Sequence, residues 1–113
     1  MPYIATRVSS EISPAKEQIL TEKFGKAITL IGKPEAWLML DFEDKCRLYF
    51  KGNKDEHSAY VEVKLLGKAA PSEYEKLTAE LAEIIHSELG IPSNRIYVKY
   101  EEVTYWGWNG NNF

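Results

Sequence analysis

The chain has 113 residues with a net charge of -3 at pH 7, and 44% of its residues are hydrophobic and 27% charged. These values fit a single globular α/β domain spanning residues 1–113. The acidic balance and the lack of a basic stripe argue against a nucleic-acid partner, and no apolar run reaches the roughly 18 residues that a membrane span needs.

The N-terminus and the cysteine count narrow the class of protein further. Residues 1–7 show neither the basic start nor the long apolar core of a secretory signal, so we expect a cytoplasmic protein. Release from the cell by a route that does not use a signal peptide stays open. Cys46 stands alone, which excludes an intrachain disulfide, a CxxC pair and a cysteine-based zinc site. His57 and His86 show no metal-ligand spacing, so we expect no metal and no other cofactor.

The first half of the chain is predicted to form a strand, a helix and a second strand. Tyr3 to Val8 is the first strand candidate, and Ser13-Pro14 then begins a helix, because serine caps helix N-termini and proline suits the first helical position. Gly32 is expected to end this helix in the left-handed conformation, and the second strand is expected from Trp37 to Phe42. The apolar stripe of the helix consists of Leu20, Phe24, Ala27, Ile28 and Ile31.

The second half predicts the same order of elements. Arg47 to Phe50 is a candidate for a short extra strand between the halves, and Tyr60 to Leu66 is the next full strand. A helix follows between Pro71 and Gly90, and Ile96 to Tyr100 is the strand after it. The apolar stripe of this helix consists of Tyr74, Leu77, Leu81, Ile84, Ile85 and Leu89. The tail from Trp106 to Gly110 predicts another short strand and a turn, since Asn-Gly favours the positive φ angles of tight turns.

An internal repeat relates the two halves, because Gly32-Lys33-Pro34 recurs as Gly90-Ile91-Pro92, 58 residues later. Strand–helix–strand units join parallel strands by right-handed crossovers. The sequence therefore predicts a duplicated β-α-β protomer in which one four-stranded mixed sheet carries both helices on one face. Strand alternation puts two sets of residues on the helix side, namely Leu38, Leu40 and Phe42, and Ile96, Val98 and Tyr100. The opposite face then carries a mixed set typical of a subunit interface, which consists of Met39, Asp41, Tyr97 and Lys99.

Pro2 is the candidate general base. Aminopeptidases generally remove an initiator methionine before a small residue, which would expose a secondary α-amine. The pKa of an ordinary α-amine is about 7.7–8.0, and burial or a nearby cation lowers it towards neutrality, where a general base works best. Proline at this position is also common without any function.

Lys33 and the paired residues Tyr97 and Lys99 are the next candidates. Lys33 either complements the helix dipole or acts as a cation that binds a carboxylate or stabilises an enolate oxygen. Tyr97 and Lys99 share a strand face, where they line either an interface, with Lys99 paired to Asp41 or Glu62, or the wall of a pocket.

Two tryptophans and a second charged pair complete the candidates. Trp106 and Trp108 flank Gly107 and either pack in the interior or floor an aromatic pocket. Glu62 and Lys64 are interpreted as an ion pair across a subunit interface.

Together these positions resemble the macrophage migration inhibitory factor and D-dopachrome tautomerase family over essentially the whole chain. Each motif is weak alone, whereas the ordered set is specific. The set consists of Met1-Pro2, Gly32-Lys33-Pro34, Leu66-Gly67-Lys68, Arg95-Ile96-Tyr97-Val98, and Trp106-Gly107-Trp108-Asn109 with Phe113.

The resemblance implies a homotrimer with sheets around a central channel and an isomerase that interconverts keto and enol forms. Its substrates would be small aromatic α-keto acids such as phenylpyruvate, or dopachrome-like compounds. Pro2 would be the proton-shuttling base, and Lys33 would bind the substrate carboxylate or carbonyl oxygen. Leu66 would contact the substrate through its backbone N–H, and Tyr97 would come from the adjacent subunit. The remaining substrate-binding candidates are Lys99, Trp106, Trp108 and Phe113.

Three positions depart from the family pattern. Lys99 stands where the mammalian family has asparagine, which predicts tighter binding of dianionic or phenolate-bearing substrates. Trp106 occupies a valine position and should narrow the pocket. The family's CxxC motif is missing around Ser58 to Val61, so its thiol-oxidoreductase activity is not carried over.

Two other interpretations stay open. The chain could be a cytokine-like binding protein that keeps a vestigial or weak tautomerase activity. It could also be a ferredoxin-like regulatory or nucleic-acid module, which the acidic charge argues against.

Overall fold

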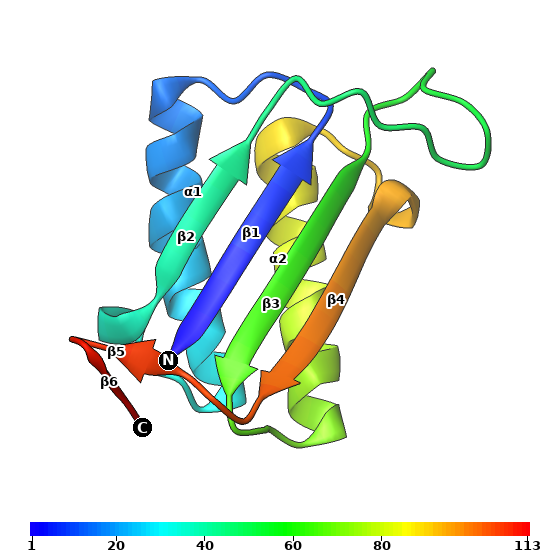
Figure 1. Ribbon diagram of the computed structural model, residues 1–113. Coiled ribbons are helices and arrows are strands. Elements are labelled where there is room, and N and C mark those ends of the chain that lie inside the picture. The colour runs from blue at the N-terminus through cyan, green and yellow to red at the C-terminus, as the bar shows by residue number, and fades with distance from the viewer.

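The computed structural model describes residues 1–113 as two layers, a four-stranded sheet and two helices that lie side by side across one of its faces (Figure 1). The strands are β1 (Pro2–Val8), β2 (Met39–Glu43), β3 (Ala59–Leu66) and β4 (Ile96–Val103). The helices are α1 (Pro14–Ala27) and α2 (Pro71–Leu89), and the tail forms a hairpin of β5 (Gly107–Trp108) and β6 (Asn111–Asn112). Neither helix combines the length and the apolar character that crossing a bilayer would require.

The sheet topology confirms the predicted duplication. Strands follow the order β2-β1-β3-β4, with β1 parallel to β2, β3 parallel to β4, and the two central strands antiparallel. Each half is thus a parallel β-α-β unit. The two units meet along β1 and β3, so the N-terminal end of β1 adjoins the C-terminal end of β3.

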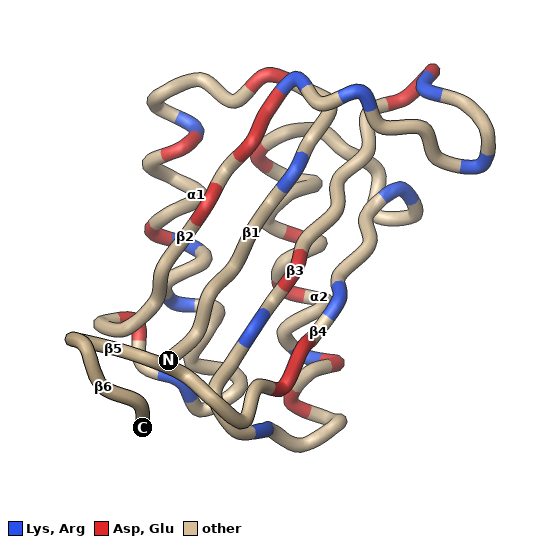
Figure 2. Tube along the Cα trace, viewed as in Figure 1, with Lys and Arg blue, Asp and Glu red and all other residues tan.

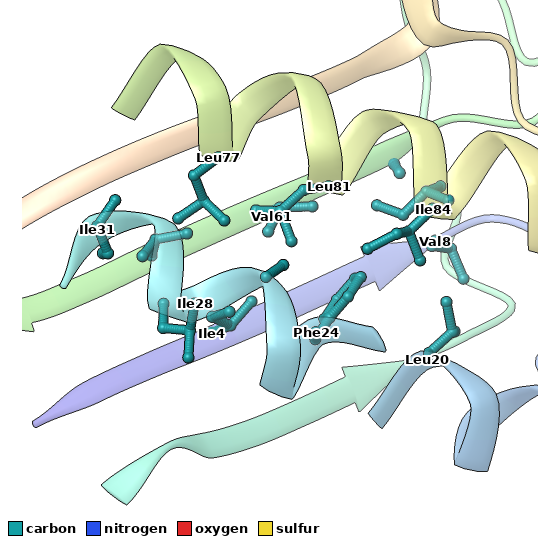
Figure 3. Packing of buried hydrophobic residues seen from close by; sticks show 14 of the residues in the cluster. Ile4, Val8, Leu20, Phe24, Ile28, Ile31, Val61, Leu77, Leu81 and Ile84 are labelled. Atoms are coloured by element: carbon teal, nitrogen blue, oxygen red, sulfur yellow. The ribbon is translucent and has the colours of Figure 1, made fainter. Parts of the chain in front are cut away.

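One core cluster fills the space between the helices and the sheet (Figure 3). Phe24 and Ile28 from the first helical segment and Leu81 from α2 have no exposed surface, and both predicted helical stripes point into this core. On β1 and β3 burial alternates residue by residue, as expected for strands with one covered face. The residues predicted on the helix side of the outer strands pack against the cluster as predicted, namely Leu38, Leu40, Phe42, Ile96, Val98 and Tyr100.

Both helices end at a left-handed glycine, as predicted, with φ of 73° at Gly32 and 70° at Gly90. The first half departs from the predicted bounds in two places. The last turn of its helix, Ile28–Ile31, is a 3-10 helix, and Glu35–Trp37 form another 3-10 turn, so that β2 begins at Met39 rather than at Trp37. In this turn the Leu38 N–H donates to the Glu35 carbonyl at 3.0 Å, which removes the preceding residues from the strand ladder.

The short strand predicted from Arg47 to Phe50 is wrong for the protomer. The segment is a loop with a single bridge from Phe50 to Asn53, closed by positive φ angles at Lys51 and Gly52. The strands β1 and β3 already have two neighbours each, so they offer this segment no free edge. The Arg95 guanidinium instead donates to the Phe50 and Asn53 carbonyl oxygens, which fixes the loop over the start of β4.

The outward face of the sheet lacks a covering layer. Its strands carry both acidic and basic residues (Figure 2), and Met39 and Tyr97 expose 66% and 62% of their surface. The predicted mixed character of this face is thus confirmed for Met39, Asp41, Tyr97 and Lys99, which are all exposed.

Candidate active site

A cleft of about 700 Å³ opens where the N-terminal end of β1 meets the start of β2 and the C-terminal hairpin. In Figure 1 the chain's N-terminus and β5 lie next to each other at this end of the sheet. Most of the lining is apolar, which makes the cleft suited to an organic ligand. The lining consists of Met1, Pro2, Tyr3, Ala36, Trp37, Leu38, Met39, Lys64, Trp106, Gly107 and Trp108.

Pro2 is buried at the first position of β1, where its backbone pairs with Leu65 of β3. Met1 precedes it, and the Leu66 N–H donates to the Met1 carbonyl oxygen at 3.1 Å. With Met1 attached, the Pro2 nitrogen is an amide nitrogen and is not basic. Burial, and secondarily the Lys33 ammonium, lower the pKa of the Met1 amine, because both disfavour its charged form.

Lys33 reaches the same end of β1 from the turn that follows the first helix. Left-handed Gly32 redirects the chain there, and the half-buried Lys33 ammonium donates to the Leu66 carbonyl oxygen at 2.9 Å. Leu66 therefore links Lys33 through its carbonyl to Met1 through its N–H. An ammonium has three donors, so two of them remain for a ligand.

Aromatic rings form the outer wall of the cleft. The Trp37 ring packs edge-on against Trp108, with centroids 4.9 Å apart and an interplanar angle of 88°, and Phe113 stacks on Trp108 at 6.3 Å. The hairpin turn at Asn109 and Gly110 has positive φ at both residues, as the Asn-Gly pair predicted, and folds Phe113 back so that its N–H donates to the Trp106 carbonyl at 3.0 Å. Phe113 lies behind Trp108 and does not line the cleft.

Tyr97 and Lys99 lie away from this cleft within the protomer. Tyr97 pairs with Tyr60, which pairs with Arg7, so Tyr97 sits five strand positions from Pro2 along the sheet. The Tyr97 ring packs edge-on against Phe50 at 5.1 Å. The Lys99 ammonium contacts Glu101 at 2.9 Å and Glu62 at 3.9 Å, so its predicted pairing with Glu62 is confirmed and that with Asp41 is not seen.

One protomer thus brings together Pro2, Lys33, Leu66, Trp106 and Trp108. Phe113 supports Trp108 from outside the cleft, Tyr97 lies near the other end of the sheet, and Lys99 lies in the middle of β4.

Sequence reasoning missed several residues of the cleft, among them Tyr3, Trp37 and Lys64. Tyr3 donates its hydroxyl to Asp41 at 2.7 Å, and this hydrogen bond is the main reason that the pKa of Tyr3 is raised. Strand alternation places Tyr3 and its cross-strand partner Lys64 on the outward face. No pattern in the sequence placed Trp37 at the cleft, because its position depends on the 3-10 turn that precedes β2.

Comparison with known proteins identifies the family of the chain. The sequence model of the macrophage migration inhibitory factor (MIF) family matches residues 1–113. The chain is 28% identical to macrophage migration inhibitory factor of Xenopus laevis over 115 residues, covering 100% of this chain and 99% of the relative.

Solved structures extend the likeness to three dimensions. The crystal structure of Leishmania major MIF2 has 38% sequence identity and a TM-score of 0.93, over 100% of this chain and 97% of that one. A macrophage migration inhibitory factor homologue from Prochlorococcus marinus has 33% identity and a TM-score of 0.89, over 98% of each chain. The chain therefore belongs to the macrophage migration inhibitory factor family and has the fold of the tautomerase superfamily.

Proposed function

We propose that the protein is a keto–enol tautomerase for aromatic α-keto acids of the phenylpyruvate type and that Pro2, freed of Met1, is its general base. One observation carries the proposal. The start of β1 lies buried at an apolar cleft, next to the Lys33 ammonium and the Leu66 N–H. A base, a cation and a backbone donor are the groups that this reaction requires.

The Met1 carbonyl supports the assignment of Leu66. In the structure this oxygen accepts the Leu66 N–H, so it stands in for a substrate oxygen at the same donor. Removal of Met1 exposes the Pro2 amine and frees the Leu66 N–H in one step. The Pro2 amine would inherit the setting that lowers the pKa of the Met1 amine, namely burial and the charge of Lys33.

The chemistry then follows from the geometry. The neutral Pro2 nitrogen takes a proton from the carbon next to the substrate carbonyl, and the electron pair of the C–H bond moves into the developing enolate. Lys33 and the Leu66 N–H hold the carboxylate or carbonyl oxygen and stabilise the negative charge that develops there. Protonation of that oxygen by the Pro2 ammonium gives the enol and restores the base. The reverse sequence gives ketonisation.

A homotrimer belongs to the same proposal. Tyr97 and Lys99 are exposed on the outward face and do not reach the cleft of their own chain, so they contribute to a pocket only if a neighbouring protomer supplies them. The uncovered sheet face and the free edges of β2 and β4 offer surfaces for this association. Light scattering coupled to size-exclusion chromatography should give about 39 kDa, three times the protomer mass of 13.0 kDa.

The test is a phenylpyruvate tautomerase assay on protein whose loss of Met1 has been verified by intact mass. Removal of a general base lowers the rate by a factor of about 10²–10⁴. Pro2→Gly should lower kcat/KM by about 100-fold, at the low end of this range, because glycine keeps a primary amine that is less rigidly held than the proline nitrogen. A matched variant with one alanine inserted between Met1 and Pro2 keeps the proline but acylates its nitrogen, and it should be equally impaired. Mass-verified wild type without activity would contradict the proposal and favour a cytokine-like binding protein.

A further inference from the structure

All but one of the charged side chains on the outward face of the sheet have a partner. The exception is Lys64 in β3, whose ammonium takes part in no ion pair and no side-chain hydrogen bond within the protomer, where Glu62 lies by Lys99. The ion pair predicted between Glu62 and Lys64 across a subunit interface stays a prediction. The partnered groups are Lys99 with Glu101, Lys99 with Glu62, Arg7 with Glu43, and Asp41 with the Tyr3 hydroxyl.

Lys64 is also the one charged side chain that lines the cleft. It lies beside Tyr3 across the β1–β3 ladder and is half-buried. Glu101 is its register partner on β4, but the Glu101 carboxylate is held by Lys99 at 2.9 Å. That hydrogen bond is the main reason for the lowered pKa of Glu101, and the charge of Lys64 contributes less. An unpaired ammonium therefore faces an apolar cleft that no carboxylate lines.

Two cations therefore lie at different positions around the cleft, and only Lys64 is among its lining residues. Lys33 lies at the Leu66 carbonyl, next to the N-terminal end of β1, where the proposed reaction needs it. Lys64 lies on the sheet face, where Met39 and the three tryptophans supply apolar lining that remains once Met1 is removed. A partly desolvated ammonium without a protein partner gains most from a ligand anion, since a hydrogen bond between ionised groups is stronger than one between neutral groups.

We propose that Lys64 binds a second carboxylate of the substrate, so that the cleft selects 2-oxo acids that carry an additional carboxylate beyond an aromatic or other apolar segment. Lys64 is thus a specificity-determining residue. The inference depends on the proposed function for the position of the first carboxylate, at Lys33 and Leu66.

The test is a binding measurement that needs no turnover. All three tryptophans of the chain line the cleft, so their fluorescence reports its occupancy. Cinnamate and 4-carboxycinnamate are planar analogues of the aromatic enol that do not tautomerise, and they differ only in the second carboxylate. Mass-verified wild type should bind 4-carboxycinnamate about tenfold more tightly than cinnamate, because a hydrogen bond to a charged group contributes about that factor or more.

Three variants assign this preference to its residue. Lys64→Met should remove it, and Lys64→Arg should keep most of it because the charge stays. Lys76→Met, which removes an exposed lysine on α2 outside the cleft, should bind both ligands like wild type. The proposal is overturned if wild type shows no preference, or if Lys64→Met retains it. Loss of the preference in Lys99→Asn alone would also overturn it, since Lys99 would then hold the second anion.

A phenylpyruvate tautomerase assay on the same wild-type protein distinguishes failure of this inference from failure of the proposed function. Wild type that prefers the dianion through Lys64 but does not tautomerise phenylpyruvate would support the anion site and contradict the tautomerase. Wild type that tautomerises phenylpyruvate but binds both cinnamates equally would overturn the anion site alone.

Discussion

The two halves of the chain have the same architecture, yet they use one equivalent position in opposite ways. Each half is a parallel β-α-β unit whose helical segment ends at a left-handed glycine. After Gly32 the first half has Lys33, whose ammonium donates to the Leu66 carbonyl oxygen next to the N-terminal end of β1. After Gly90 the second half has Ile91, which has no exposed surface and lies in the core.

This difference shows that the repeat provides the scaffold and that function arises from its asymmetry. The second half has a continuous α2 helix to Leu89, whereas the first half ends its helix in a 3-10 turn. Both halves have a 3-10 turn before the second strand of the unit, Glu35–Trp37 before β2 and Ser93–Arg95 before β4. The turn of the first half carries Trp37, which lines the cleft, whereas the equivalent Arg95 donates to the Phe50 and Asn53 carbonyl oxygens over the start of β4. Equivalent positions of the repeat therefore differ in side chain and in role.

Exchanging the residue types at the equivalent positions 33 and 91 tests this difference between the halves, and Ile91→Lys should have the largest effect. It places an ammonium in the core without a partner, which should lower the free energy of unfolding by about 3–5 kcal/mol. Ile91→Val, as the control, should cost only about 1 kcal/mol. Chemical denaturation followed by circular dichroism at one protomer concentration measures both. Equal stability of Ile91→Lys and wild type would show that Ile91 is not a core residue.

The reciprocal change, Lys33→Ile, should impair activity and spare stability. Loss of the cation at the developing enolate should lower kcat/KM for phenylpyruvate by about 100-fold, as for other groups that stabilise an oxyanion. The free energy of unfolding should change by less than about 1 kcal/mol, because the half-buried Lys33 side chain is not part of the core. Lys33→Arg keeps the charge and should be less impaired than Lys33→Ile. Full activity in Lys33→Ile would remove Lys33 from the mechanism.

The two helix-ending glycines, Gly32 and Gly90, occupy equivalent positions at which the halves should respond alike to substitution. Gly32→Ala and Gly90→Ala each force a Cβ into the left-handed region, with φ of 73° and 70°, and neither Cβ would meet another atom within 4 Å. Both should therefore lose about 1–2 kcal/mol of stability from the backbone conformation alone. Thermal unfolding of the two variants under identical conditions measures the costs. A clearly larger loss at one glycine would mean that its turn has a role beyond ending the helix.

The smallest expected effect concerns the ion pairs that join the halves. Lys16 and Lys23 of α1 both contact Glu88 of α2, at 3.1 and 2.7 Å, and their hydrogen bonds lower the pKa of Glu88. A carboxylate with a lowered folded-state pKa stabilises the fold above its unfolded-state pKa, and this contribution is lost as the pH falls through the folded-state value. Glu88→Gln should thus lower the melting temperature slightly at pH 7 and not at pH 3. A destabilisation that persists at pH 3 would have to come from packing of the side chain and not from its charge.

Sequence patterns alone were sufficient for most of the fold. Apolar stripes at helical spacing, proline at the helix starts and glycine at the helix ends define α1 and α2, because these signals depend on local backbone and side-chain chemistry. Alternation on Leu38, Leu40 and Phe42 correctly indicated the covered face. The segment from Arg47 to Phe50 was misassigned, because its residues suit a strand but it pairs with no strand of the protomer, and pairing is a property of the sheet rather than of the segment.

The chemistry of the site was in part determined by the sequence as well. It identified Pro2 and Lys33 as candidate base and cation, since a proline behind an initiator methionine and a lysine at a helix-ending turn are visible without coordinates. Only the tertiary structure decided which groups meet. It joined residues 33 and 66 through a hydrogen bond, paired Lys99 with Glu101, and left Lys64 unpaired in the cleft. These outcomes depend on strand register and on competition among neighbouring charges, which are set across the sheet and not along the chain.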